Sequence, residues 1–574
     1  MQFVRKSLHD YFGRAPRHAS KWMNLFHHLL EARFRVLIFL ISLAAHIPYL
    51  FGRYLPRESL KYFSGDENAL IRVIERYQSH FASAEWGALL SERLQYGYGF
   101  LYYITYSVFT YPFALLAGDE GILAAGRLLS SSFESATIVL VCMIAKRFGG
   151  PAWLIVLLGI AMALTPGLMV IHKPLSAEQL SNLLIVAAAY SALTMPLASL
   201  RRNLFLISTL ASAAISIKLN AALEGLFFAA LIFFRLYTER IDFWLSAERA
   251  AAKVKTFAVD CSVMIAGLLT FFIWNLPILL STASRENFFS WLVIQAQSNH
   301  NSQRGNILYK GIEGWWPKID TYFGDNNLLF WILLSGFVAI FLGLFIKKSK
   351  DLSFYALLAL IWVCVPATYV ILTVKKVWLW YLLLPGLFLL LGPVLLYVMG
   401  VRLRSMGRRW WGCGLSAVAT LLLILQIYVA VPDYAALASE RWRETERADF
   451  IDVEAMRASL TREVAGHLDE TSMIVDPQLT LPVDAWRAAG AHIEVRLLPT
   501  ISETIIAEQK PDYLVIRLWG YAHHQGNKRK ALVDFEAKIK ASCAHGGPCY
   551  DQWARYDPSR TIVYRKRNSN SETN

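Results

Sequence analysis

Several motifs that would indicate nucleotide or zinc chemistry are missing from this sequence. It has no Gly-x-x-x-x-Gly-Lys phosphate loop, no Gly-x-Gly-x-x-Gly ahead of a helix and no His-Glu-x-x-His. Those motifs supply the backbone amides or paired imidazoles that hold phosphate groups and Zn²⁺. Their absence argues against an ATP-driven pump and a zinc protease. The first polar loop also has no Asp-x-Asp, so a metal-dependent nucleotide-sugar enzyme is not indicated, and we predict no cofactor and no metal site.

Cysteine is scarce, with six residues in a chain of 574. Cys543 and Cys549 enclose a short polar loop, and their spacing predicts a small disulfide in an oxidising compartment. A zinc site is a weaker alternative, because Cys543, His545 and Cys549 offer only three ligands. The other four lie in or beside apolar runs and are predicted to be inert small hydrophobic residues: Cys142, Cys261, Cys364 and Cys413.

Apolar residues are in excess. The chain is 55% hydrophobic and 13% aromatic, with a mean hydropathy of +0.38. Soluble globular proteins average about 45–50% apolar residues, so lipid must solvate most of this chain. The net charge of +14 comes from Lys and Arg in short connections between hydrophobic runs, which is the positive-inside pattern. These charges set orientation and contact anionic head groups, and we predict a lipid bilayer, and no nucleic acid, as a partner.

The hydrophobic runs predict an all-α polytopic membrane protein with about eleven spans. Residues 1–35 form a basic cytoplasmic N-terminus, and residues 36–431 form the transmembrane domain with external loops at 53–96 and 284–325. We expect 97–117 to be a helix at or dipping into the membrane, because the later basic loops then stay inside. The predicted location is the inner (plasma) membrane, with the C-terminal domain outside the cytoplasm.

Beyond Pro432 charged residues become frequent and the apolar runs shorten. We predict that 432–574 form a small extracytoplasmic α/β domain. Its helices are expected near 440–467 and 529–541. Its short strands are expected at Ser472–Val475, His492–Leu498, Tyr513–Leu518 and Thr561–Tyr564. The sequence has no internal repeat.

Unusual polar residues fall on the outer side of this topology. The adjacent carboxylates Asp66 and Glu67 follow the first hydrophobic segment. Ionisable residues at membrane depth usually face an interior cavity. Basic residues there would hold the phosphate of an anionic lipid carrier, and a carboxylate would deprotonate the acceptor. The other members of this outer set are His172, Glu178, Lys218, Asn220, Arg304, Lys375 and Lys376.

Ordinary structural roles stay open for these residues. Asp66 and Glu67 fit a solvated turn, and Glu178 fits a helix cap. Lys375 and Lys376 fit interfacial anchors whose ammonium groups reach the head groups. Arg127 and Glu134 lie two helical turns apart within one apolar run, hence on roughly one face, and this predicts a structural pair.

Several short segments, taken in order, resemble the GT-C membrane glycosyltransferases of the protein O-mannosyltransferase and aminoarabinose-transferase type, which use polyprenyl-phosphate sugars. The similarity covers roughly residues 35–400. Asp66-Glu67 falls where the family places acidic residues in its first external loop. The other similar segments are Tyr98–Tyr103 (without the family's two prolines), Gly126–Ser130, Ala145–Gly149, His172–Glu178, Ile217–Asn220 and Lys376–Pro385.

The resemblance implies inverting transfer of a sugar from a polyprenyl-phosphate donor to a glycan, glycolipid or protein acceptor. Asp66 or Glu67 would be the general base. The phosphate would be held by Lys218, Arg304, Lys375 and Lys376, with Asn220, Tyr381, His172 and Glu178 as further substrate-binding residues. Two other hypotheses stay open. One is a transporter or flippase of polyprenyl-linked glycans, and the other is a non-catalytic scaffold that presents residues 432–574.

Overall fold

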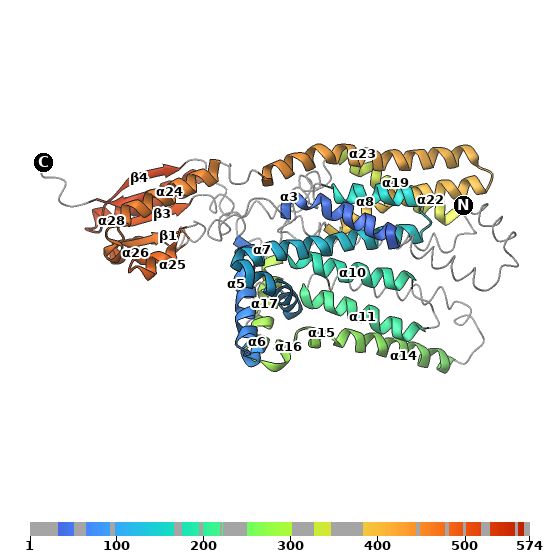
Figure 1. Cartoon of the computed structure of the whole chain (residues 1–574), viewed down its shortest axis with the longest axis horizontal. Helices are drawn as coiled ribbons and strands as arrows, with labels where there is room; N and C mark the ends of the chain where they lie inside the picture. The colour runs from blue at the N-terminus through green and yellow to red at the C-terminus, as the bar shows by residue number, and fades with distance from the viewer. Residues whose placement is uncertain are drawn as a thin grey trace.

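The chain is mostly helical, with a small sheet domain at its C-terminal end (Figure 1). The computed structural model describes residues 32–50, 65–91, 98–165, 175–194, 199–218, 221, 250–300, 326–345, 383–442, 448–476, 481–496, 501–517, 528–556 and 561–567. In these ranges four helices are long and apolar enough to cross a membrane: Phe100–Arg147, Ala250–Trp274, Gly386–Ser405 and Arg409–Ala436. The predicted span at 221–234, apart from Ala221, and the predicted span at 354–374 lie outside the described residues, so the total of about eleven stays a prediction.

The described residues of the helical part begin with a helix over residues 32–45. Two helices occupy the described part of the predicted first external loop, α5 (Gly65–Ala82) and α6 (Trp86–Ser91). The other helices in the described residues of this part are α3 (Ile47–Leu50), α7 (Phe100–Arg147), α8 (Ala152–Ala163), α10 (Ala177–Thr194), α11 (Leu200–Ile217), α14 (Ala250–Leu269), α15 (Phe271–Trp274), α16 (Leu276–Leu280), α17 (Thr282–His300), α19 (Asn326–Phe345), α21 (Leu383–Leu389), α22 (Leu391–Ser405) and α23 (Arg409–Trp442).

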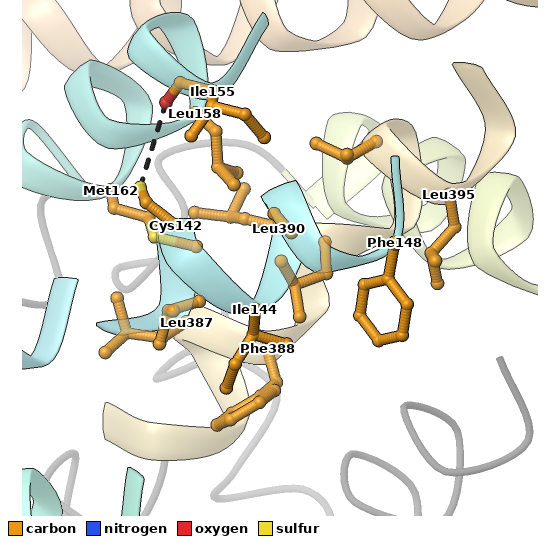
Figure 2. Packing of buried hydrophobic residues seen from close by; sticks show 14 of the residues in the cluster. Cys142, Ile144, Phe148, Ile155, Leu158, Met162, Leu387, Phe388, Leu390 and Leu395 are labelled. Carbon is orange, nitrogen blue, oxygen red and sulfur yellow. Dashed lines mark hydrogen bonds between the residues drawn. The ribbon is translucent and has the colours of Figure 1, made fainter. Parts of the chain in front are cut away.

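The largest hydrophobic core joins α7, α8, α10, α19, α22 and α23. Figure 2 shows Cys142 of α7, with Phe148 at the end of that helix, packed near Ile155 of α8 and Leu390. The Cys142 thiol donates to the Ile155 carbonyl oxygen at 3.7 Å. Cys142 is therefore buried inside the bundle, as its apolar surroundings in the sequence predict.

Element α7 consists of two helices that fold back on each other. Ala117 and Gly118 leave the helical conformation, and Gly118 has φ +56°. The Tyr106 hydroxyl lies 2.6 Å from Ser130 Oγ. A straight helix would hold residues this far apart in sequence about 36 Å from each other, so the chain reverses at Gly118. A Cβ at Gly121 would lie 2.1 Å from the Phe113 carbonyl oxygen, so this return requires glycine. The prediction of a helix over 97–117 is confirmed from Phe100 onward.

The C-terminal domain contains one five-stranded sheet of order β2-β1-β3-β5-β4. β1 pairs in parallel with β2 and with β3, whereas β5 is antiparallel to β3 and to β4. Its elements are α24 (Ala448–Val464), η5 (Leu468–Glu470), β1 (Ser472–Val475), α25 (Val483–Ala488), β2 (His492–Val495), α26 (Glu503–Gln509), β3 (Tyr513–Arg517), α28 (Lys528–Ala544), β4 (Tyr550–Tyr556) and β5 (Thr561–Lys566). The four predicted strands are confirmed, and β4 is an additional one.

Helices cover both faces of this sheet. Met456 and Leu460 of α24 and Trp486 of α25 pack against one face, and Ile506 of α26 and Phe535 of α28 pack against the other. The predicted Cys543–Cys549 disulfide is present and joins the end of α28 to the start of β4. Because both thiols are bonded to each other, they are not available as zinc ligands. Upstream, α23 continues through Pro432 to Trp442, so the change in composition at 432 lies inside a helix.

Candidate functional site

Four of the predicted site residues fall within the described part of the chain. Asp66 and Glu67 belong to the first turn of α5, and only the backbone of this turn is described. Glu178 and Lys218 are described with their side chains. The remaining predicted residues lie outside the described ranges: His172, Asn220, Arg304, Lys375, Lys376 and Tyr381. The geometry of the site is therefore built on Glu178, Lys218 and the helices that hold them.

Glu178 and Lys218 form an ion pair. The Lys218 ammonium donates to Glu178 Oε1, and the side chains are 19% and 9% exposed for Lys218 and Glu178. Glu178 lies in the first turn of α10, and Lys218 ends α11 in an extended conformation. The Ser181 hydroxyl donates to the Ala214 carbonyl oxygen at 3.2 Å, so the start of α10 and the end of α11 lie side by side. Two of the predicted outer-face residues, from separate connections, thus meet at one point.

The carboxylate of Glu178 keeps one oxygen unused by the pair with Lys218. It is buried, and among the described residues its second oxygen, Oε2, has no hydrogen-bond partner. An unsatisfied buried carboxylate oxygen is costly, on the order of 1–3 kcal/mol or more for a charged group. Such an oxygen is free to accept a hydrogen bond from a bound hydroxyl or water.

A short extended segment at Tyr98 and Gly99 lies against the end of α11 next to Lys218. Tyr98 forms an isolated antiparallel bridge with Lys218, and the Gly99 amide donates to the Ile217 carbonyl oxygen at 3.2 Å. A Cβ at Gly99 would lie 1.6 Å from the Ser216 carbonyl oxygen, so only glycine permits this approach. The Phe100 amide donates to Asn275 Oδ1 at 3.3 Å, which joins α15 and α16 to the same place.

Helix α5 is fixed to the same end of the bundle. Leu70 and Ile71 belong to one buried cluster with Ala177 and Ile217, the chain neighbours of Glu178 and Lys218. Asp66 and Glu67 stand one helical turn earlier on α5. Figure 1 shows α5 and α6 together at this end of the helical part. Carboxylates in a first turn are also favoured by the helix dipole, so their position alone is compatible with a purely structural role.

Buried aromatic residues and an amide anchor the other half of α5. The Gln78 amide nitrogen donates to the Ser107 carbonyl oxygen at 3.1 Å and to Thr110 Oγ1 at 2.9 Å. The buried rings of Tyr77 and Tyr103 pack with centroids 5.6 Å apart. The sequence predicted a polar loop here, and it holds a helix that packs tightly on the first half of α7.

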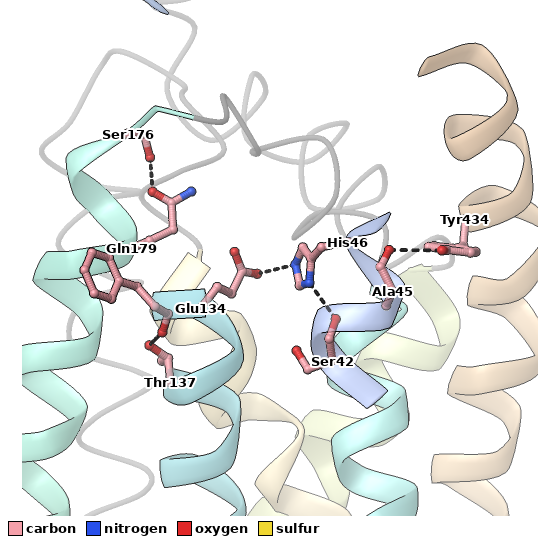
Figure 3. A network of polar contacts seen from close by, with 9 residues as sticks. Ser42, Ala45, His46, Glu134, Thr137, Ser176, Gln179 and Tyr434 are labelled. Atoms are coloured by element: carbon pink, nitrogen blue, oxygen red, sulfur yellow. Dashed lines mark hydrogen bonds and ion pairs between the residues drawn. The ribbon is translucent and has the colours of Figure 1, made fainter. Parts of the chain in front are cut away.

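A second polar network of the helical part is more fully buried (Figure 3). His46 Nε2 is 3.7 Å from Glu134 Oε1, and both side chains are 1% exposed. The other ring nitrogen, Nδ1, donates to the Ser42 carbonyl oxygen at 2.6 Å. The Tyr434 hydroxyl donates to the Ala45 carbonyl oxygen at 3.0 Å, which connects α23 to the same turn. Glu134 therefore pairs with His46, a partner that the sequence analysis did not name, and the predicted Arg127–Glu134 pair stays a prediction.

Comparison with known proteins does not assign the chain to a family. No protein-family model matches the chain, and no curated protein matches it in sequence. The resemblance to GT-C glycosyltransferases therefore depends on the ordered segments themselves. Two of these segments, Gly126–Ser130 and the one containing Lys218, lie close to the site. Leu175, two residues before Ala177, would contact a Cβ at Gly126 at 2.2 Å. The assignment to this family stays a prediction.

Proposed function

We propose that the protein is a membrane glycosyltransferase that moves a sugar from a polyprenyl-phosphate carrier to an acceptor at the outer face. The observation that carries this proposal is the Glu178–Lys218 pair, set beside the helix that begins with Asp66 and Glu67. In this proposal the chain has a GT-C-like arrangement of about eleven spans in the inner membrane. Its N-terminus is cytoplasmic and its C-terminal domain is outside the cytoplasm.

Lys218 provides the positive charge for the donor phosphate. Without substrate, Glu178 holds the ammonium in place through Oε1. An arriving phosphate shares Lys218 with Glu178, and charge-assisted hydrogen bonds of this kind are roughly twice as strong as neutral ones. Glu178 Oε2 then accepts a hydrogen bond from a sugar hydroxyl. Arg304, Lys375 and Lys376 are the further cations that the proposal assigns to the phosphate.

Asp66 or Glu67 acts as the general base. The acceptor hydroxyl or amine attacks the anomeric carbon of the sugar, and its proton passes to the carboxylate. The bond between the anomeric carbon and the phosphate oxygen breaks on the opposite side, so the configuration inverts and polyprenyl phosphate leaves. A positioned general base contributes about 10²–10⁴-fold in rate. No metal or other cofactor takes part in the proposed step.

The test is a transfer assay on the full chain in membranes, with radiolabelled polyprenyl-phosphate sugars and an extract of cell-envelope glycans as acceptor. The Asp66→Asn/Glu67→Gln double variant is expected to lose transfer by about 10²-fold or more. The matched control is Asp119→Asn/Glu120→Gln, because Gly118-Asp119-Glu120 repeats the tripeptide Gly65-Asp66-Glu67 at another helix start. The control variant is expected to keep its activity.

Two outcomes would count against the proposal. If both single variants and the double variant at Asp66 and Glu67 keep full transfer, neither carboxylate is the base. If the labelled sugar crosses the bilayer while still attached to its lipid, with no new glycosidic bond, the protein is a flippase. Product analysis separates these outcomes, because only a transferase releases polyprenyl phosphate.

A further inference from the structure

The turn between α22 and α23 is a tight reversal that depends on glycine. Gly407 has φ +86°, and the Arg408 amide donates to the Leu403 carbonyl oxygen at 3.0 Å, which closes the end of α22. A Cβ at Gly412 would lie 2.4 Å from the Gly400 carbonyl oxygen, so the two helix backbones touch directly below the turn. Two of the four helices long and apolar enough to cross a membrane end here, and a turn between two such spans lies at a membrane surface.

Positive charge is concentrated at this turn, and no carboxylate of the described residues pairs with it. The sequence has no Asp or Glu between Asp351 and Asp433. Among the described residues no ion pair involves any of the four arginines of the turn, which are Arg402, Arg404, Arg408 and Arg409. Like charges this close repel one another, so an anion supplied from outside the chain would stabilise the turn.

Arg404 is held below the turn, between the two helices. Its side chain packs at Gly412, where a Cβ would lie 2.5 Å from Arg404 Cγ. The guanidinium donates to Ser416 Oγ at 3.3 Å, and Nε is buried without a hydrogen-bond partner among the described residues. Ser416 stands one turn of α23 further from the surface than Gly412. A cation at this depth is costly unless a negative group reaches it.

Two exposed tryptophans follow the arginines. Trp410 and Trp411 are 90% and 74% exposed, although both rings are large and mainly apolar. Val401 and Met406 add two more exposed apolar side chains at the same turn. Tryptophan is enriched at membrane–water interfaces, where the ring lies beside the acyl chains and its N–H meets the head groups. The turn therefore offers both positive charge and apolar surface, and a phospholipid with a negative head group matches both.

We propose that the α22–α23 turn binds the head group of an anionic phospholipid. The guanidinium groups of Arg404, Arg408 and Arg409 donate to its phosphate oxygens. The rings of Trp410 and Trp411 lie against its glycerol and the upper part of its acyl chains. A zwitterionic phospholipid carries its own ammonium group and leaves the arginine charge uncompensated. The turn lies at the opposite end of the helical part from α5, so this site is independent of the proposed transfer reaction (Figure 1).

The test is native mass spectrometry of the purified full chain in detergent, with an equal mixture of dioleoylphosphatidylglycerol and dioleoylphosphatidylcholine as the probe. Phosphatidylglycerol is expected to be bound in preference by about tenfold or more, the scale of attraction between two arginines and an anionic head group. Arg408→Gln/Arg409→Gln is expected to remove most of this preference. The matched control is Arg147→Gln/Arg202→Gln, which removes two exposed arginines from the same end of the helical part and should keep the preference (Figure 1).

A second variant separates the two parts of the site. Trp410→Ala/Trp411→Ala is expected to reduce the occupancy of both phospholipids while leaving the preference unchanged, because the rings contact parts that the two lipids share. Photolabelling of the unmodified chain keeps the test independent of how the variants fold. A phosphatidylglycerol with a diazirine in its head group is expected to label residues 402–412. Unlabelled phosphatidylglycerol should compete with it, and excess inorganic phosphate should not.

Four results would overturn the proposal. One is equal binding of the two phospholipids by the parent chain, and another is photolabelling that falls outside the α22–α23 turn. A third is displacement of the lipid by inorganic phosphate, which would indicate a site for the free ion. The fourth is an equal loss of preference in Arg408→Gln/Arg409→Gln and in the control, which would indicate attraction by the whole end of the helical part and no discrete site.

Discussion

Two ion pairs of the helical part and one of the C-terminal domain differ in their contact with solvent. Glu178–Lys218 and His46–Glu134 are enclosed among helices, whereas Arg567 and Asp551 of the sheet domain are 48% and 59% exposed. Coulomb interactions weaken in water and strengthen in the interior, where desolvation also becomes expensive. Breaking either of the two enclosed pairs is therefore expected to have a larger effect than breaking the exposed pair at the sheet.

The two buried pairs of the helical part also differ from each other. His46 and Glu134 are sealed on every side, whereas Lys218 keeps 19% of its side chain exposed and lies next to α5. A sealed pair is able to stabilise the fold but not to contact a substrate. A partly open pair is able to do both. Variants at these two pairs distinguish a role in stability from a role in substrate binding.

Lys218→Met is expected to have the largest effect, because it removes a proposed phosphate ligand and leaves Glu178 uncompensated. We expect transfer to fall by about 10²-fold or more, as for loss of one preorganised electrostatic group. Unfolding free energy is expected to fall by about 3 kcal/mol. Transfer assays and thermal unfolding in detergent measure the two quantities.

The double variant Glu178→Gln/Lys218→Met separates catalysis from stability. It removes both charges, so stability should return toward the parent value while transfer stays low. Full recovery of transfer in the double variant would show that Lys218 serves only the fold. The conservative Lys218→Arg variant should keep the charge and part of the activity.

Glu134→Gln is expected to reduce stability without reducing transfer per folded molecule. It leaves the buried imidazole of His46 without its charged partner, at a cost of about 3 kcal/mol. Replacing both residues together, as His46→Leu/Glu134→Leu, should be much closer to neutral. Loss of transfer in a stably folded double variant would contradict the division between a sealed pair and an open one.

The same contrast explains which features the sequence reveals. Glu178 and Lys218 stand out because each interrupts an apolar pattern at a predicted helix end, and both fall on the predicted outer face. His46 pairs with Glu134, a residue far along the chain, and no local spacing pattern indicates such a contact. The predicted helix over 97–117 ends close to the break at Ala117 and Gly118, but the pattern does not indicate which way the chain turns beyond it. Contacts between residues far apart in sequence decide whether the chain continues as a kinked helix or folds back as a helical hairpin.

The sheet domain illustrates the same limit. β1, β3 and β5 are buried apolar runs, and the hydrophobic pattern predicts them, as it does β2. β4 reads Tyr-Asp-Gln-Trp-Ala-Arg-Tyr, and most of its residues are exposed or half-buried. It pairs with β5 alone among the described strands and is an edge strand. Polar side chains are typical of edges, so its pattern gave no strand signal.

Removing the disulfide is expected to have an intermediate effect that is confined to the sheet domain. The Cys543→Ser/Cys549→Ser variant opens a short loop, and chain entropy assigns such a loop about 2 kcal/mol. Limited proteolysis should cleave the C-terminal domain more readily, while the helical part keeps its resistance. If cleavage spreads equally to both parts, they do not unfold as separate units.

The smallest expected effect is at the exposed Asp551–Arg567 pair. The hydrogen bond from Arg567 lowers the pKa of Asp551 below its ordinary value of 3.8. Because the folded pKa is the lower one, this stabilisation is present above the ordinary pKa and is lost as the pH falls through the folded value.

Solvent limits the contribution of this pair to a few tenths of a kcal/mol. In the Asp551→Asn variant, the free energy of unfolding should fall slightly less steeply as the pH is lowered. A concentration of 1 M NaCl should have a similar effect on the parent chain, because salt screens exposed charges. Denaturant unfolding of the full chain between pH 3 and pH 7 measures this. A loss as large as that of Glu134→Gln would mean that the surface of the sheet domain is shielded from solvent, and the contrast between the two regions would disappear.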